Sequence, residues 1–201
     1  RMTAIVDFRN VHEGKRLFVL ASGPSLEALD LQRLERRLVM GLNRSFFAYP
    51  QTHYHCMFDH RLFELYPEAS QDTRYLFTLP GRPHGIGIPL LGAEGFSWDL
   101  EQGIYSGYTI AYFALQVAVY LGFREIVYLG LDLCHVPGKT HFFGSDFNSR
   151  THESTEFPRM QKALTGAAIS LRKRGIRVIN CSPISTLQCF ERMSFEEAVA
   201  L

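Results

Sequence analysis

The stretch YSGYTIAYFALQVAVYLGFREIVYLGLD, residues 105–132, decides the fold class. Its first part is apolar around a whole helical circumference and ends at Gly122, where a C-terminal cap belongs, so it predicts a buried helix. Its second part, residues 124–132, contains a continuous apolar run at residues 126–131 that opens with β-branched Ile and Val, typical of a central parallel strand covered on both faces. A buried helix that leads directly into a buried strand indicates an α/β domain.

The same alternation of strand and helix continues on both sides of this stretch. We predict further strands at residues 17–21, 38–42, 52–58, 74–79 and 176–181, and helices at residues 25–36, 61–66 and 157–174. Residues 80–95, rich in Gly and Pro, indicate a long loop without regular elements, and residues 184–201 indicate one or two helices. Such an order predicts one doubly wound, mainly parallel Rossmann-like sheet with helices on both faces.

Length and composition favour a single domain over residues 1–201, with a mobile, lid-like insertion at about 133–156 after the fifth strand. The net charge of +1 gives no global field that would favour nucleic acid or an anionic membrane. Residues 110–123, the longest apolar run, are too few to span a bilayer. No segment has the pattern of a signal peptide, so we expect a cytoplasmic protein. The four cysteines lack zinc-ligand spacing, and we expect no metal.

Small polar residues follow several of the predicted strands. In open α/β sheets, ligands bind beyond the carboxyl ends of the strands, near the point where the strand order reverses. The candidates at this edge are Ser22, Gly23, Pro24 and Ser25 after the first strand, Asn43 after the second, Asp59 and His60 after the third, Asp132 after the fifth and Ser182 after the sixth. Ser106 and Gly107 open the buried helix and face the same crevice. We therefore predict a ligand site at this edge of the sheet.

The turn at Gly23-Pro24-Ser25 has the composition of an anion-binding helix start. Gly23 allows a close backbone approach, Pro24 fits the first helical turn, and the N–H groups that follow favour an anion. The turn matches neither the dinucleotide fingerprint nor a Walker loop, so a plain strand-to-helix connection is the alternative. Ser106 has a similar alternative, because a serine at a helix start is a natural N-cap.

The polar residues after the fifth strand hold the candidate base. His135, His141 and His152 lie there beside Lys139, and a loop histidine of near-neutral pKa is the commonest general base, although surface histidines are the alternative. Asp132 closes a buried strand, where a carboxylate needs a partner or a ligand.

Two histidines in the third strand raise a separate question. His53 and His55 share a strand face with Asp59, but they fit ordinary strand histidines better than a metal site.

Four motifs in order resemble a known superfamily. LASGPSLEALD, GLNRSF, residues 105–133 and GKTHFFG together resemble the bacterial sialyltransferases of glycosyltransferase family 42 and the related hydroxymethylpterin diphosphokinases and flagellin glycosyltransferases. The resemblance implies an enzyme that moves an acidic sugar, sialic acid- or Kdo-like, from a CMP-activated donor to a glycan hydroxyl. That reaction would be inverting and metal-independent, in bacterial lipopolysaccharide or capsule synthesis. Homo-oligomerisation and peripheral contact with the inner membrane stay open.

The resemblance also implies roles for particular residues. The nucleotide pocket would include Ser22, Gly23, Pro24, Ser25, Asn43, Ser106, Gly107 and Asp132. The base would be His152, counted back from the last long helix, or His141, counted from the GKTH run, and we favour His152. Lys139 or Thr140 would meet the leaving phosphate. The sialyltransferases carry Asn where this chain has Ser22, and their lid is longer, which leaves the donor's identity open.

Two alternatives to the transferase follow from the same residues. One is an ATP-dependent pyrophosphokinase of the hydroxymethylpterin type, which would need Mg²⁺ held by Asp59 and Asp132. The other is a non-catalytic nucleotide- or glycan-binding module.

Overall fold

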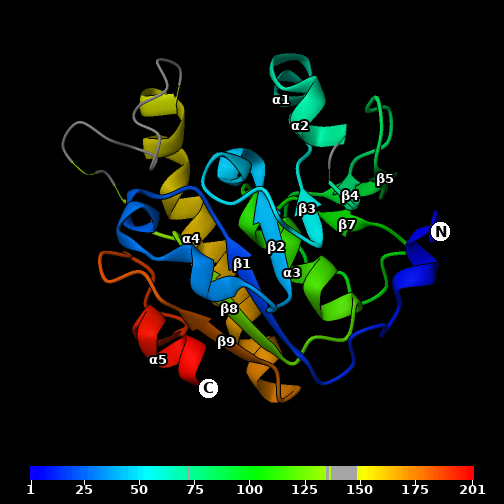
Figure 1. Ribbon diagram of the computed structural model, residues 1–201. Helices are drawn as coiled ribbons and strands as arrows, with labels where there is room; N and C mark the ends of the chain where they lie inside the picture. Colours follow the sequence, from blue (N-terminus) through cyan, green and yellow to red (C-terminus); the bar gives the residue numbers. More distant parts are fainter. Residues whose placement is uncertain (72, 135, 137–148) are drawn as a thin grey trace.

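A mainly parallel sheet organises the molecule (Figure 1). The computed structural model describes residues 1–71, 73–134, 136 and 149–201. Eight strands pair in the order β10-β9-β8-β1-β2-β3-β4-β5, and every neighbouring pair is parallel. Their bounds are β1 Arg16–Leu20, β2 Val39–Leu42, β3 Tyr54–Cys56, β4 Tyr75–Thr78, β5 Ile86–Gly87, β8 Glu125–Leu129, β9 Arg177–Asn180 and β10 Glu191–Arg192. The predicted fold class is confirmed.

Helices and a small second sheet complete the described chain. The α-helices are α1 His60–Leu65, α2 Pro67–Gln71, α3 Ile110–Tyr120, α4 Ser149–Lys173 and α5 Phe195–Ala200. The 3₁₀ helices are η1 Ile5–Phe8, η2 Pro24–Ala28, η3 Leu31–Leu34 and η4 Asn43–Phe47. Strands β6 Leu90–Gly92 and β7 Ile104–Tyr105 pair in parallel beside the main sheet. Among the described residues, no helix is long and apolar enough to cross a membrane.

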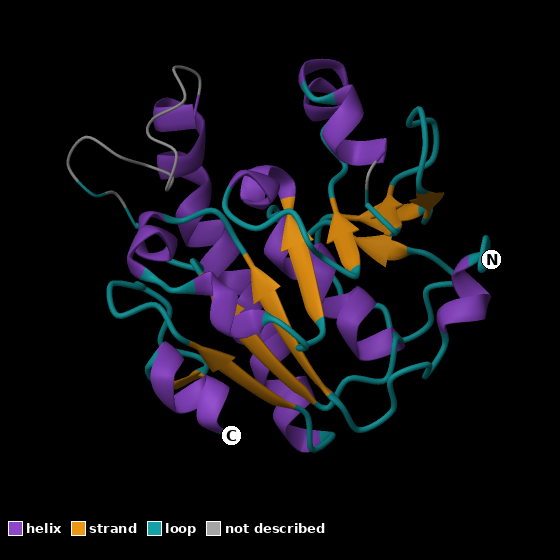
Figure 2. Cartoon of the chain, in the orientation of Figure 1, coloured by secondary structure: helices purple, strands orange, loops and turns teal. Residues whose placement is uncertain are grey.

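Helices cover both faces of the main sheet (Figure 2). Successive side chains of a strand point to opposite faces, so one strand contributes to two cores. Leu17 and Val19 of β1 belong to one core with α3 and α4. Phe18 and Leu20 belong to a second core with η2, η3 and α5. Helix α3 is buried along almost its whole length, as predicted, and Gly122 follows its end with φ 97°, a conformation that suits glycine.

Two of the predicted elements were wrong, and the predicted helical tail was correct only in part. The helix predicted over residues 25–36 is two short 3₁₀ helices, η2 and η3, separated by extended backbone at Leu29. Residues 80–95, predicted as an irregular loop, contain β5 and β6. The tail predicted as helical contains β10 before α5.

Helix α4 begins eight residues before the predicted start at residue 157. Part of the predicted lid, residues 149–156, is therefore helical. Most of the remaining lid residues lie outside the described chain, so its mobility stays a prediction.

Charged residues begin four adjacent strands at the amino-terminal edge of the sheet. Arg16 of β1 pairs with Glu125 of β8. Arg177 of β9 reaches Glu125 at 3.7 Å and Glu191 of β10 at 2.6 Å. The signs alternate across the four strands, so each neighbouring pair in this row is attractive.

The strand order reverses between β1 and β8. From β1 the chain adds β2, β3, β4 and β5 on one side, and from β8 it adds β9 and β10 on the other. Open α/β sheets bind ligands beyond the carboxyl ends of the strands at such a switch point, which here lies at β1 and β8.

Candidate nucleotide-binding site

A cavity of about 110 Å³ lies at this switch point. It is lined by residues 21–23 after β1, 42–43 after β2, 109–111 at the start of α3, 130–134 after β8, and 157 and 160 on α4. The structure thus brings four predicted residues to one cavity, namely Ser22, Gly23, Asn43 and Asp132. The predicted edge of the sheet and the cavity coincide.

Asp132 fixes the Gly-Pro-Ser turn through hydrogen bonds from Ser25. The Ser25 backbone N–H and hydroxyl both donate to the Asp132 carboxylate, at 2.8 and 2.5 Å. Gly23 donates to the Gly130 carbonyl at 2.8 Å, and a Cβ at Gly23 would overlap both that carbonyl and the Asp132 carboxylate. Glycine is required here for packing against Asp132. The Ser25 N–H, expected to favour an anion, already has an internal carboxylate acceptor.

Asp132 is 2% exposed and joins three segments of the chain. The Ser182 hydroxyl, after β9, donates to the carboxylate oxygen that also accepts from the Ser25 hydroxyl. The Asp132 carbonyl accepts from the Thr186 N–H at 3.1 Å. The buried carboxylate predicted from the sequence therefore has partners, and they are hydroxyl and backbone donors of the protein itself.

Ser22 and Asn43 are two polar residues of the cavity wall. Within the described residues, neither the Ser22 hydroxyl nor the Asn43 amide makes a hydrogen bond to the protein, and both residues are partly exposed. Asn43 has left-handed backbone, with φ 48°. Both groups can exchange hydrogen bonds with a ligand.

His55 lies beneath Asn43 and was missed as a site residue. It is 2% exposed, and its Nε2 lies 2.8 Å from the Asn43 carbonyl oxygen. Burial lowers the His55 pKa from its ordinary 6.5 to about 4, although the hydrogen bond to Asn43 raises it slightly. The ring is therefore neutral near pH 7. The pairing of β2 with β3 places His55 beneath Asn43, and a local sequence pattern does not reveal that pairing.

Ser106 and Gly107 do not line the cavity. Their N–H groups donate to the Gly92 and Ala93 carbonyls, at 3.0 and 2.9 Å, beside β6. The predicted N-cap at Ser106 was wrong: Thr109 caps α3, and its side chain accepts from the Ala111 N–H. A nucleotide contact by Ser106 or Gly107 remains a prediction.

The predicted catalytic and phosphate-binding residues fall on the part of the chain that the structure does not describe. His135, Lys139, Thr140 and His141 lie outside the described residues. His152 lies on the described backbone of α4, but its side chain lies outside the description. Their assignments stay predictions.

Groups that suggested a metal site have separate partners. Val39 N–H donates to His53 Nδ1, His55 contacts the Asn43 carbonyl, and Asp59 pairs with Arg61. Within the described ranges, no three His, Cys, Asp or Glu side chains are grouped to hold a metal.

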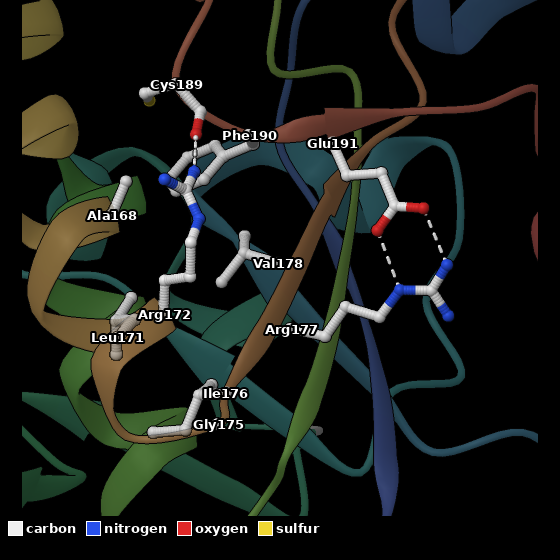
Figure 3. Close-up of a pocket in the computed structure, with 10 residues that line it drawn as sticks. All are labelled: Ala168, Leu171, Arg172, Gly175, Ile176, Arg177, Val178, Cys189, Phe190 and Glu191. Atoms are coloured by element: carbon white, nitrogen blue, oxygen red, sulfur yellow. Dashed lines mark hydrogen bonds and ion pairs between the residues drawn. The ribbon is translucent and has the colours of Figure 1, made fainter.

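A larger cavity, of about 300 Å³, lies between the end of α4 and strands β9 and β10 (Figure 3). Its walls combine apolar side chains with Arg172, Arg177 and Glu191. Arg172 donates to the Cys189 carbonyl at 3.3 Å. Arg177 makes two hydrogen bonds to Glu191. Both cations thus have partners, and the cavity lies at the amino-terminal edge of the sheet, away from the switch point.

Comparison with known proteins gives one short sequence match and a shared fold. No protein-family model matches the chain. An uncharacterized protein of Treponema pallidum is 47% identical over 47 residues, which make up 23% of this chain and 12% of that protein.

Solved structures of the sialyltransferase CstII resemble most of the chain. The Campylobacter jejuni enzyme in complex with CMP is 19% identical, with a TM-score of 0.53 over 90% of this chain and 86% of that one. The complex with CMP-3FNeuAc is 17% identical, with a TM-score of 0.54 over 90% of this chain and 86% of that one. The complex with a trisaccharide acceptor and CMP is 18% identical, with a TM-score of 0.52 over 88% of this chain and 85% of that one. At these identities the likeness shows a shared fold.

Proposed function

We propose that the protein is a glycosyltransferase that moves an acidic sugar from a CMP-linked donor to a hydroxyl of a glycan. The observation that carries this proposal is the cavity at the β1/β8 switch point, whose wall presents the Ser22 hydroxyl and the Asn43 amide. The fold shared with sialyltransferases solved with CMP supports the choice of nucleotide. We place the reaction in bacterial lipopolysaccharide or capsule synthesis.

In this proposal the nucleotide lies against the carboxyl ends of β1 and β2. Ser22 and Asn43 would exchange hydrogen bonds with its base or ribose, because both groups can donate and accept. Asp132 would act indirectly, since its carboxylate holds the Gly-Pro-Ser turn through Ser25 and the loop after β9 through Ser182. The pocket wall is thus fixed before a ligand arrives, which lowers the ordering cost of binding.

The proposed chemistry is a single inverting displacement. His152, or His141, accepts the proton of the acceptor hydroxyl as its oxygen bonds to the anomeric carbon. The bond from that carbon to the phosphate oxygen breaks at the same time, and CMP leaves with the electron pair. Lys139 or Thr140 stabilises the charge that develops on the leaving phosphate. No step requires a metal.

The geometry disfavours the pyrophosphokinase alternative. That reaction needs Mg²⁺ held by carboxylates, and Asp59 and Asp132 were the candidates. Asp132 is buried against Ser25 and Ser182, and Asp59 pairs with Arg61 at the start of α1. Neither carboxylate is arranged to share a cation with the other.

A ligand screen tests the nucleotide. Thermal shift and calorimetry with CMP, CDP, UDP, GDP and ATP, each with and without Mg²⁺, should show a preference for CMP that Mg²⁺ does not change. Stabilisation by ATP alone, and only with Mg²⁺, contradicts the proposal. If CMP is preferred, release of CMP from CMP-sialic acid in EDTA should be lost in His152→Ala or in His141→Ala while CMP binding is kept. No turnover with any CMP-sugar supports the binding module.

One substitution tests the site itself. Asn43→Gly keeps the left-handed backbone without strain but removes the amide, so CMP affinity should fall about tenfold, the cost of a lost pair of hydrogen bonds. Asn10→Gly is the matched control, because Asn10 also has left-handed backbone, at φ 55°, and lies outside this cavity. Equal affinities of the two variants contradict the assignment of Asn43.

A further inference from the structure

We propose that His55 is the positioning residue of the nucleotide site, and that it fixes the turn which presents the Asn43 amide. This inference rests on the proposed function for its ligand. The buried His55 side chain does not line the cavity, so it acts on the shape of the cavity wall. Three contacts of the His55 ring, together with one hydrogen bond within the turn, carry the inference.

The first contact comes from the sheet register. His55 of β3 is the direct partner of Gly41 of β2. A Cβ at Gly41 would lie 2.6 Å from His55 Nδ1, well inside contact distance. The absence of a side chain at Gly41 therefore makes the space that the imidazole fills under the end of β2.

The second contact fixes the proton on the ring. A backbone carbonyl only accepts hydrogen bonds, so His55 Nε2 must donate to the Asn43 carbonyl, at 2.8 Å. The neutral ring then carries its proton on Nε2 and a lone pair on Nδ1. Nδ1 is buried without a hydrogen-bond partner in the described chain. The imidazole thus uses its single N–H on the carbonyl of the residue that lines the cavity.

A hydrogen bond within the turn that follows β2 and a third contact of the His55 ring secure that turn. The Ser45 hydroxyl, which is fully buried, accepts from the Leu42 N–H at 2.9 Å. The Phe46 ring lies 6.0 Å from the His55 ring. His55 therefore meets the chain at Gly41 of β2, at the Asn43 carbonyl and at the Phe46 ring.

These contacts explain how Asn43 keeps a backbone conformation that few residues other than glycine adopt. Asparagine tolerates left-handed backbone better than most residues, but the conformation still has a cost and persists only where the surroundings enforce it. The hydrogen bond from His55 orients the peptide that follows Asn43 and, through that residue's φ and ψ, the direction of its side chain. Without the bond, the carboxamide would lose its fixed place in the wall.

Calorimetry with CMP as the probe tests the proposal. His55→Leu keeps much of the volume and removes the donor, so CMP affinity should fall about tenfold, the equivalent of about 1.4 kcal/mol. His55→Gln supplies an amide donor and should recover part of the affinity. In the Asn43→Gly background, His55→Leu should cause no further loss, because the group that it positions is already absent.

The matched control is His53→Leu. His53 lies one residue before β3 and accepts a hydrogen bond from the Val39 N–H at 3.3 Å, so it shares the strand region but not the turn. Its replacement should leave CMP affinity unchanged. If wild type binds CMP, and folded His55→Leu binds it equally or loses the same factor in the Asn43→Gly background, the inference is wrong.

Failure of the proposed function is recognised separately, because wild type would then bind no CMP. The positioning role is judged in that case by nitrogen-15 NMR of the wild-type histidines and of the Asn43 backbone. A neutral His55 protonated on Nε2, with left-handed Asn43 shifts that are lost in His55→Leu, supports it. A proton on Nδ1, or Asn43 shifts unchanged in the variant, overturns it. The wild-type spectrum decides the tautomer even if the leucine variant does not fold.

Discussion

Asp132 shows how a single buried carboxylate can hold the wall of a cavity together through donors of the protein itself. Its partners within the described chain are the Ser25 N–H and the hydroxyls of Ser25 and Ser182. Hydrogen bonds to a charged group contribute roughly 1.5–3 kcal/mol each, more than neutral ones. The residue that ends the Gly-x-Asp sequence is therefore a structural anchor for the turn above it.

Replacing Asp132 by Asn should destabilise the fold by about 2–4 kcal/mol. The amide provides one acceptor oxygen where the carboxylate provides two. Its NH₂ group only donates hydrogen bonds, so it cannot accept one from the serine donors that face it. Urea unfolding measures the change. Asp99→Asn is the matched control. The Asp99 side chain is 42% exposed and pairs with Arg9, so this ion pair should contribute about 1 kcal/mol or less to the free energy of unfolding. Equal losses in the two variants would contradict the anchoring role.

At the scale of elements, α3 depends on the turn before it. Gly107 has φ 57°, and a Cβ there would overlap the Tyr112 ring in the first turn of the helix. The Tyr112 hydroxyl donates to the Gly95 carbonyl at 2.5 Å, which ties the helix start to the segment after β6. Gly107 thus lets the turn pack closely against the first turn of α3, the helix whose start lines the cavity.

Gly107→Ala should lower the free energy of unfolding by about 3–5 kcal/mol, since backbone strain and overlap with a buried ring add. Gly14→Ala is the control. Gly14 also has left-handed backbone, at φ 77°, but a Cβ there would meet no atom within 4 Å. That variant should lose only about 1–2 kcal/mol, the cost of the strain alone. Chemical denaturation of both proteins separates the two contributions, and similar losses would show that the ring contact is unimportant.

The elements that sequence could predict are those with a strong local signal. The strands around Val19, Met40 and Val127 are apolar runs that the structure confirms. Residues 25–36 were predicted as one helix because Leu26 and Leu34 can share one helical face. Two 3₁₀ helices separated by extended backbone bury both side chains equally well. Short strands β5 and β6 carry too few residues for periodicity to detect.

The site was predictable to the extent that it follows from topology. Ser22, Gly23, Asn43 and Asp132 were found because each follows a strand, and parallel strands end at one edge. His55 was missed because its role depends on Gly41 opposite it in the neighbouring strand. The two residues are 14 positions apart in sequence, and no local pattern records that they are partners.

At the scale of the whole molecule, His55 couples stability to pH. Its pKa is about 4 in the folded protein and near 6.5 when it is exposed on unfolding. Between these values the unfolded chain binds a proton that the folded chain does not, so stability falls as the pH drops from 6.5 towards 4. Over this interval the loss should be about 3 kcal/mol, and stability should be level above pH 7 as far as this group is concerned.

Unfolding free energies of wild type and His55→Gln, measured in urea from pH 7.5 to 4, check this coupling. Wild type should lose more stability than the variant over the interval, because glutamine does not titrate. Burial also lowers the pKa of His12 and His53, but both groups are present in the two proteins and cancel in the difference. Parallel pH profiles would show that His55 is accessible to protons in the folded state.

The alternating charges that begin β1, β8, β9 and β10 have a consequence for how this fold can change. A slip of one residue between neighbours would separate Arg16 from Glu125 and Arg177 from Glu191, and it would also turn apolar side chains away from both cores. Strand alignment is therefore secured at the edge of the sheet remote from the cavity. Ser22 and Asn43 carry no part of that task, so exchanging Ser22 for another polar side chain should leave the alignment of the strands the same. The amino-terminal border of the sheet thus sets the strand register, while Asp132 at the opposite border holds the turn beside the cavity.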